Sequence, residues 1–143
     1  MTAVDALQEC LAAEHAAVYG YGVLGGVLAG VTPVGSSEQQ RAASAYVEHR
    51  RRRDELTSLI TGRGSEPVAA EAAYDVPRQV QTVQDCRDLA RLIEDRCAQT
   101  YADAVSRTTD RDRELTAGAL TACTLTAVGW GAPIEPFPGV AEI

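Results

Sequence analysis

The sequence predicts an all-α protein of four helices in a single domain that covers residues 1–143. Hydrophobic residues make up 45% of the chain but aromatic residues only 5%, so alanine, leucine and valine form the expected core. Alanine and leucine favour helices. Four segments carry apolar residues at steps of three and four, which is the spacing of one helix face. Three of these segments follow a serine or threonine that can cap a helix N-terminus.

The first helix is expected over residues 3–29, and its buried face carries one unusual residue. Gly30 and Pro33 mark its end. Its internal glycines lower the helix propensity, so we expect a neighbouring element to pack closely against them. On the apolar face, Glu14 occupies a position where leucine is expected. A buried carboxylate costs several kcal/mol unless a cation, a metal ion or hydrogen bonds meet it, so Glu14 predicts polar partners elsewhere in the chain.

The second helix is expected over residues 37–61, and its buried face also carries ionisable residues, His49 and Arg53. Most of the basic run at residues 50–53 must point outward, because a helix turns by about 100° per residue. Acidic residues flank this run, and the formal net charge of the chain is −7. A nucleic-acid-binding protein is therefore not expected.

The segment after the second helix is long and lacks periodicity. A loop of this length inside a compact domain needs a reason, and a crossover that runs the length of the bundle provides one. The third helix is then expected over residues 83–107 and the fourth over residues 112–128. Helices joined by short, long and short connections are typical of the ferritin-like variant of the four-helix bundle. In the tail, residues 129–143, Trp130 and Phe137 are expected to fold back onto the bundle.

The register of the helices predicts that the unusual polar residues meet in the middle of the bundle. A hairpin that turns near residue 33 places Glu14 level with Arg52 and within one helical turn of His49. The third helix runs parallel to the second in this topology, and Glu94 lies as far into the third helix as Glu48 lies into the second. The expected polar core cluster comprises Glu14, Tyr46, His49, Arg52, Arg53 and Glu94.

This cluster has three interpretations. In the first, the cations of the second helix, Arg52 and Arg53 with His49, neutralise the two carboxylates in a buried ion-pair network. In the second, Glu14, His49 and Glu94 bind a single metal ion, with Glu48 or Tyr46 as additional ligands. In the third, the same groups line a pocket for a small ligand. The arginines favour the first interpretation, because a cation beside a metal site opposes metal binding.

Four segments of the chain resemble the alanine-rich, ferritin-like family of actinobacteria that is known only as a domain of unknown function. They are Leu11–Gly22, His49–Asp54, Ala73–Pro77 and Glu94–Asp103, so the resemblance covers nearly the whole chain. It implies a ferritin-like bundle that forms a dimer, and it implies no established activity.

More remotely, the first and third helices resemble those of di-iron carboxylate proteins, in which each of them supplies one glutamate. The di-iron pattern also needs Glu-x-x-His on both the second and the fourth helix, because two metal ions share six ligands. Tyr46 stands at the glutamate position before His49, and the inner face of the fourth helix offers no such pair. The sequence therefore predicts a degenerate di-iron site.

The remaining motifs indicate no reaction. The four cysteines are expected to be buried thiols, and Cys97, beside Arg96, is the one candidate for a reactive thiolate. No set of residues suggests nucleophilic catalysis. No apolar run is long enough to span a bilayer, and the first residues lack the features of a signal peptide. We therefore expect a cytoplasmic protein without membrane contact.

The function expected from the sequence is that of a non-enzymatic structural or binding protein that works as a homodimer without a cofactor. The glycines of the first helix and the tail with Trp130 and Phe137 are the expected dimer contacts. The alternative is a mononuclear metal-binding or redox protein that uses Glu14, His49 and Glu94.

Overall fold

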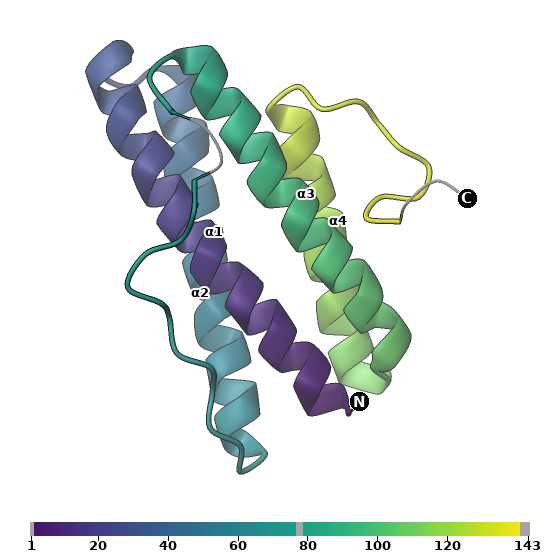
Figure 1. Cartoon of the computed structure of the whole chain (residues 1–143). Helices are drawn as coiled ribbons and strands as arrows, with labels where there is room; N and C mark the ends of the chain where they lie inside the picture. The colour runs from purple at the N-terminus through teal and green to yellow at the C-terminus, as the bar shows by residue number, and fades with distance from the viewer. Residues whose placement is uncertain (1, 77–78, 141–143) are drawn as a thin grey trace.

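The computed structural model describes residues 2–76 and 79–140 of the chain, and four helices form this part of the protein (Figure 1). They are α1 (Ala3–Val31), α2 (Ser37–Gly62), α3 (Val83–Arg107) and α4 (Asp110–Gly129). The described residues contain no strand, which confirms the prediction of an all-α fold. Within the same residues, no helix combines the length and the apolarity that crossing a membrane requires.

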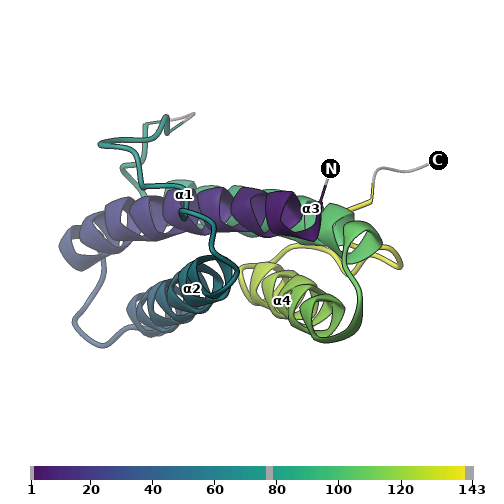
Figure 2. The same ribbon diagram turned by 90° about the horizontal axis from the view of Figure 1, so that it is seen from below.

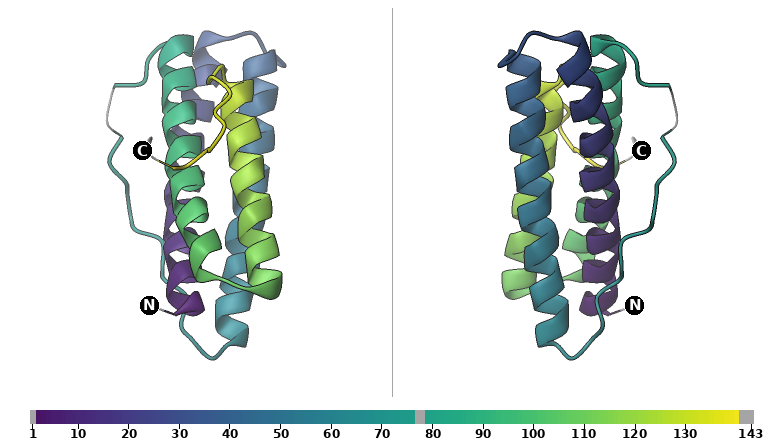
Figure 3. Two further views of the ribbon diagram at one scale, coloured as in Figure 1. Left: turned by 90° about the vertical axis from the view of Figure 1, so that its right-hand side faces the viewer. Right: turned by 90° about the vertical axis from the view of Figure 1, so that its left-hand side faces the viewer.

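The helices are arranged in two layers. α1 packs against both α2 and α3, and α3 packs against α4. In Figure 2, α1 and α3 form one layer, while α2 and α4 form the other. The described part of the connection from α2 to α3 runs along the outside of α1 for most of the length of the bundle (Figure 3). α3 therefore starts at the end of the bundle where α1 finishes, as a long crossover requires.

Side-chain caps account for the starts of the first three helices. Thr2 accepts a hydrogen bond from the backbone N–H of Asp5, and the Asp5 carboxylate accepts one from the backbone N–H of Thr2. Thr82 and Asp85 form the same reciprocal pair at the start of α3, and Ser36 caps α2. Each cap satisfies backbone donors that lack a partner in the first helical turn.

The crossover is fastened to α1 by two polar side chains. The Gln8 side chain donates to the backbone carbonyl of Glu66 at 2.7 Å and accepts from the backbone N–H of Val68 at 2.8 Å. The Nε2 atom of His15 lies 3.0 Å from the carbonyl oxygen of Val68. His15 therefore faces the crossover, whereas the second histidine of the chain lies in the core.

Close packing against the glycines of α1 occurs at Gly20. A Cβ atom at this position would lie 2.5 Å from Cδ1 of Ile93 on α3, so the missing side chain lets the two helices approach each other. At Gly22, Gly25 and Gly26, no neighbouring atom of the described chain lies within 4 Å of the place that a Cβ atom would take. The expectation of close packing is confirmed at Gly20 and is wrong at these three glycines.

The tail folds back through Trp130 but not through Phe137. Trp130 is buried, and its Nε1–H donates to the hydroxyl of Tyr21 at 3.1 Å. Arg91 donates to the carbonyl oxygen of Trp130 at 3.0 Å and also to that of Gly131. Phe137 is 75% exposed, so the expectation that it folds back is wrong. Prolines on both sides of Phe137 restrict the backbone there, whereas the indole N–H of Trp130 finds an acceptor in the core.

Candidate functional site

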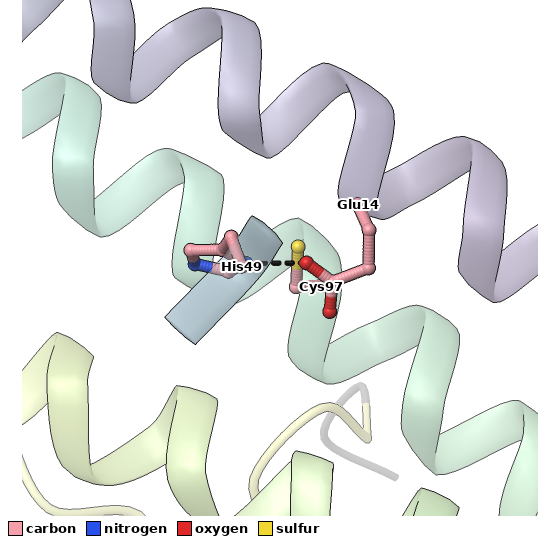
Figure 4. A group of neighbouring side chains, drawn as sticks. All are labelled: Glu14, His49 and Cys97. Atoms are coloured by element: carbon pink, nitrogen blue, oxygen red, sulfur yellow. Dashed lines mark hydrogen bonds and ion pairs between the residues drawn. The ribbon is translucent and has the colours of Figure 1, made fainter. Parts of the chain in front are cut away.

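The candidate site lies in the core, where α1, α2 and α3 each contribute a residue that can carry charge. Glu14 comes from α1, His49 from α2 and Glu94 from α3, and all three are 0% exposed. Figure 4 shows the His49 ring and the Glu14 carboxylate pointing toward each other. The structure therefore brings these three predicted residues together.

His49 bridges the two carboxylates. Its Nδ1 lies 2.5 Å from Oε2 of Glu14, and its Nε2 lies 3.0 Å from Oε1 of Glu94. An ionised carboxylate only accepts hydrogen bonds, and a neutral imidazole carries a proton on only one ring nitrogen. Two hydrogen bonds to two carboxylates therefore require the doubly protonated imidazolium. His49 acts as a cation in this site.

Arg52 supplies the second positive charge. Its Nε donates to Oε1 of Glu14 at 2.9 Å, and the residue is 6% exposed. Its Nη2 lies 3.2 Å from Nδ1 of His49. Since both nitrogens carry protons, this is a contact between two cations, and the Glu14 carboxylate bonds to both of them. With Glu94, the site holds two negative and two positive charges, and this neutrality avoids the cost of an uncompensated buried charge.

Two buried tyrosines complete the site in a reciprocal pattern. The Tyr101 hydroxyl on α3 donates to Oε1 of Glu14 on α1 at 2.5 Å, and the Tyr21 hydroxyl on α1 donates to Oε1 of Glu94 on α3 at 2.6 Å. On each helix the tyrosine follows the glutamate by seven positions. Seven residues are about two helical turns, so each glutamate lies level with the tyrosine of the other, antiparallel helix. Neither phenol was predicted as a site residue, although this repeated spacing was a signal that could have identified them.

The contacts within the site determine its protonation states. Burial alone would raise the pKa of Glu14, but the hydrogen bond from His49 and the charges of His49 and Arg52 lower this pKa below its ordinary value. Burial alone would lower the pKa of His49, but its bonds to Glu14 and Glu94 raise it to about 10. Burial, followed by the neighbouring carboxylate, raises the pKa of both phenols, so the phenols remain hydrogen-bond donors.

Cys97 lies beside this network as an uncharged thiol. It is buried, and Figure 4 shows it close to Glu14 and His49. One ligand atom from each of these three residues lies within 4.8 Å of the other two. The hydrogen bond with Cys123, burial and the nearby carboxylates raise the pKa of the Cys97 thiol well above its ordinary value. Arg96 is exposed and does not reverse this shift, so the expectation of a reactive thiolate at Cys97 is corrected.

Arg53 was predicted in the cluster but lies outside it. It follows Arg52 by one position, and about 100° of helix rotation separates the two side chains. The Arg53 guanidinium pairs with its neighbour Asp54, and its side chain is 26% exposed. Of the two arginines considered on this face of α2, only Arg52 reaches the core carboxylates.

Tyr46 and Glu48 also lie outside the network. Tyr46 is half-buried, and the guanidinium of Arg50 packs over its ring at 5.4 Å from the ring centre. Glu48, considered as an additional metal ligand, is exposed and pairs with Arg51 at 3.2 Å. The rotation of the helix that directs His49 and Arg52 into the core places Tyr46 at the edge of the bundle and directs Glu48 toward solvent.

The residues of the site do not fit a di-iron centre. Such a centre needs about six side-chain ligands, including two Glu-x-x-His pairs. The site offers two glutamates and one histidine, and both ring nitrogens of that histidine face carboxylates. The buried residues of α4 are Thr116, Ala119 and Cys123, which provide neither glutamate nor histidine. The guanidinium of Arg52 also lies against Glu14, where it would repel a metal ion.

Comparisons with known proteins identify relatives of the fold and of the chain. The model of the family described as "Domain of unknown function (DUF4439)" matches residues 6–142. The structure is similar to the crystal structure of the conserved hypothetical protein rv2844 from Mycobacterium tuberculosis, with a TM-score of 0.80, 33% sequence identity and coverage of 90% of this chain and 94% of that chain.

A second solved structure connects the fold to a wider class. The chain is similar to the crystal structure of ferritin-like, diiron-carboxylate proteins from Bacillus anthracis str. Ames, with a TM-score of 0.70, 17% identity and coverage of 90% of this chain and 91% of that chain. This likeness confirms the ferritin-like fold, and at this identity it shows the fold alone. No curated protein matches the chain.

The raised pKa of His49 predicts that stability falls as the pH rises. Its folded pKa of about 10 exceeds the ordinary value of 6.5, so its contribution is complete below 6.5 and is lost as the pH passes through 10. We expect the free energy of unfolding to decrease by roughly 3–5 kcal/mol over this window. Urea unfolding at a series of pH values measures it.

The matched variants for this experiment are His49→Gln and His15→Gln. The buried thiols also lower stability at high pH, because burial raises the pKa of Cys10 to about 12. The difference between wild type and His49→Gln at each pH removes this contribution. His15→Gln removes the histidine that faces the crossover and is the control for replacing a histidine. Equal pH dependence in wild type and His49→Gln would show that the His49 ring is not an imidazolium.

Proposed function

The chain belongs to the family described as a domain of unknown function (DUF4439), and within it we propose that this protein is a non-enzymatic structural or binding protein with a degenerate di-iron site. In this proposal a neutral ion-pair network stands in the place of the metal centre. The observation that carries it is the His49 ring, whose two nitrogens meet the carboxylates of Glu14 and Glu94 while Arg52 provides the second cation.

A non-enzymatic role is supported by the hydrogen bonds and burial of Glu14 and His49. Glu14 accepts from His49 at one oxygen and from Arg52 and Tyr101 at the other. A general acid or base must come within hydrogen-bond distance of a substrate proton, and Glu14 and His49 are 0% exposed. Their hydrogen bonds hold three helices together, and breaking them to act on a substrate would leave buried charges without partners.

The alternative proposal is a mononuclear metal-binding or redox protein, and one observation favours it. Ligand atoms of Glu14, His49 and Cys97 lie within 4.8 Å of one another, which is a compact donor set of types that bind Zn²⁺ or iron. Glu94, the third ligand expected from the sequence, bonds to the opposite ring nitrogen from Glu14. Metal binding would require the His49 imidazolium to lose a proton and the buried Cys97 thiol to ionise beside the carboxylates of Glu14 and Glu94, which raise its pKa, so we favour the ion-pair network.

Two further observations support proposals about the source of the family and the cellular location of the protein. The similarity to a protein of Mycobacterium tuberculosis supports an actinobacterial family. The four cysteines are free and buried in the described chain, which is typical of proteins in a reducing compartment and supports a cytoplasmic location.

Metal analysis distinguishes the two proposals. We expect the purified protein to contain no stoichiometric iron, manganese or zinc, and we expect added metal to leave the melting temperature unchanged, because both nitrogens of His49 already bond to carboxylates. Elemental analysis and thermal unfolding check this. Near-stoichiometric metal, or a melting shift that disappears in His49→Ala and Cys97→Ser, would establish the metal site instead.

Removing the arginine of the network tests its structural role. Arg52→Ala leaves Glu14 buried with less positive charge, and the free energy of unfolding should fall by about 3–5 kcal/mol. Arg53→Ala removes an adjacent guanidinium that pairs with Asp54 outside the core, and it should cost about 1 kcal/mol or less. Denaturant unfolding of both variants makes the comparison. Equal losses, or a gain in metal affinity of Arg52→Ala without loss of stability, would contradict the network.

The homodimer remains a proposal, and its contact is proposed at Gly22 and Gly25 of α1. Gly22 and Gly25 line a shallow groove of about 330 Å³ between α1 and α2, where another helix could approach closely. Trp130 is buried within its own chain and is therefore not available as a contact. Sedimentation should show a dimer for wild type and Gly30→Leu, and a monomer for Gly25→Leu, which fills the groove. A monomeric wild type would contradict the proposal.

A further inference from the structure

A cavity of about 350 Å³ opens beside the network, between α3, the end of α4 and the tail. Its lining includes Glu94, the network carboxylate on α3, and the acidic residues Asp95 and Glu135. Ala98 and Ala127 form part of its apolar wall. The volume lies at the lower end of the range for small-molecule sites, which is about 300–1,000 Å³.

Glu94 has one oxygen that the network does not use. Its Oε1 accepts from His49 and from Tyr21, whereas its Oε2 is buried and has no hydrogen-bond partner in the described part of the chain. A buried carboxylate oxygen without a donor is costly. Since Glu94 itself lines the cavity, a donor group in the cavity is the natural partner for this oxygen.

The charges around the cavity favour a cation. Three carboxylates line it, and the Asp95 carboxylate accepts a hydrogen bond from the neutral side-chain amide of Gln99 at 2.8 Å. Arg91 also lines the cavity, but it donates to the backbone carbonyls of Trp130 and Gly131. The Arg91 guanidinium is therefore directed at the tail, and the three acidic residues of the lining outnumber this one basic residue.

We propose that this cavity binds a small organic cation with a primary ammonium group, which donates a hydrogen bond to Oε2 of Glu94. The apolar part of the ligand would pack against Ala98 and Ala127. An ammonium suits this place better than Ca²⁺ or Mg²⁺, because those ions need six or more oxygen ligands in a compact shell and the network leaves Glu94 one oxygen to give. The inference rests on the proposed function, because the ion-pair network holds the Glu94 side chain in place through His49 and Tyr21.

The test titrates the full-length protein with n-butylammonium and follows binding by NMR chemical shifts of the backbone amides. n-Butanol is the neutral probe of similar shape, and tetramethylammonium is a cation without an N–H donor. We expect saturable binding of n-butylammonium with shifts at residues that line the cavity. Binding should be at least about tenfold weaker for the other two probes, because n-butanol lacks the positive charge and tetramethylammonium lacks the N–H donor. Equal binding of all three probes, or no saturable binding, overturns the proposal.

Three variants test whether binding depends on the cavity. Glu94→Gln removes the negative charge, and Ala127→Leu fills the cavity without touching the network; each should weaken binding at least about tenfold. Glu48→Gln removes an exposed carboxylate that pairs with Arg51 and lies outside both the network and the cavity lining, and it should leave binding nearly unchanged. Weakening by Glu48→Gln, or no effect of Ala127→Leu, would contradict the cavity. Failure of the proposed function appears separately, as bound metal in the purified protein.

Discussion

The hydrogen bonds of His49 are the interaction on which the rest of the structure depends. One imidazole ring joins α2 to Glu14 on α1 and to Glu94 on α3, so three of the four helices meet at a single side chain. Removing this ring would leave two carboxylates in the core with Arg52, which bonds to Glu14, as the remaining cation, and an uncompensated buried charge is strongly destabilising. The balance of positive and negative charge at the site is therefore needed for the three helices to pack together.

The positive charge of the site comes from side chains that share one face of α2. His49 and Arg52 are three positions apart, a spacing that places both on the same side of a helix. In a di-iron protein of the same fold, metal ions supply the positive charge that carboxylates on facing helices require. Here Tyr21 and Tyr101 each donate a hydrogen bond to the glutamate of the opposite helix. These bonds add to those that the carboxylates accept from His49 and Arg52. Apart from Oε2 of Glu94, the described chain supplies hydrogen-bond partners for the carboxylate oxygens of the site.

The sequence predicts the helices and the level at which polar residues meet, because both depend on periodicity and loop length. It does not distinguish Arg52 from Arg53, because a small error in the phase of a helix decides which of two adjacent side chains points inward. It also does not separate Trp130 from Phe137, since burial of the tail depends on an acceptor, the Tyr21 hydroxyl, that lies far away in the chain. The cavity beside Glu94 depends on the path of the tail, which no local pattern encodes.

The most direct test of the account is the protonation state of the His49 ring, read from the ¹⁵N NMR signals of the histidine nitrogens in the purified protein. The chain has two histidines, so a His15→Gln variant assigns the spectrum. At a pH of about 8, between the ordinary value of 6.5 and the folded pKa of about 10, we expect both nitrogens of His49 to carry protons. A ring nitrogen without a proton, whether free or bound to a metal ion, would contradict it.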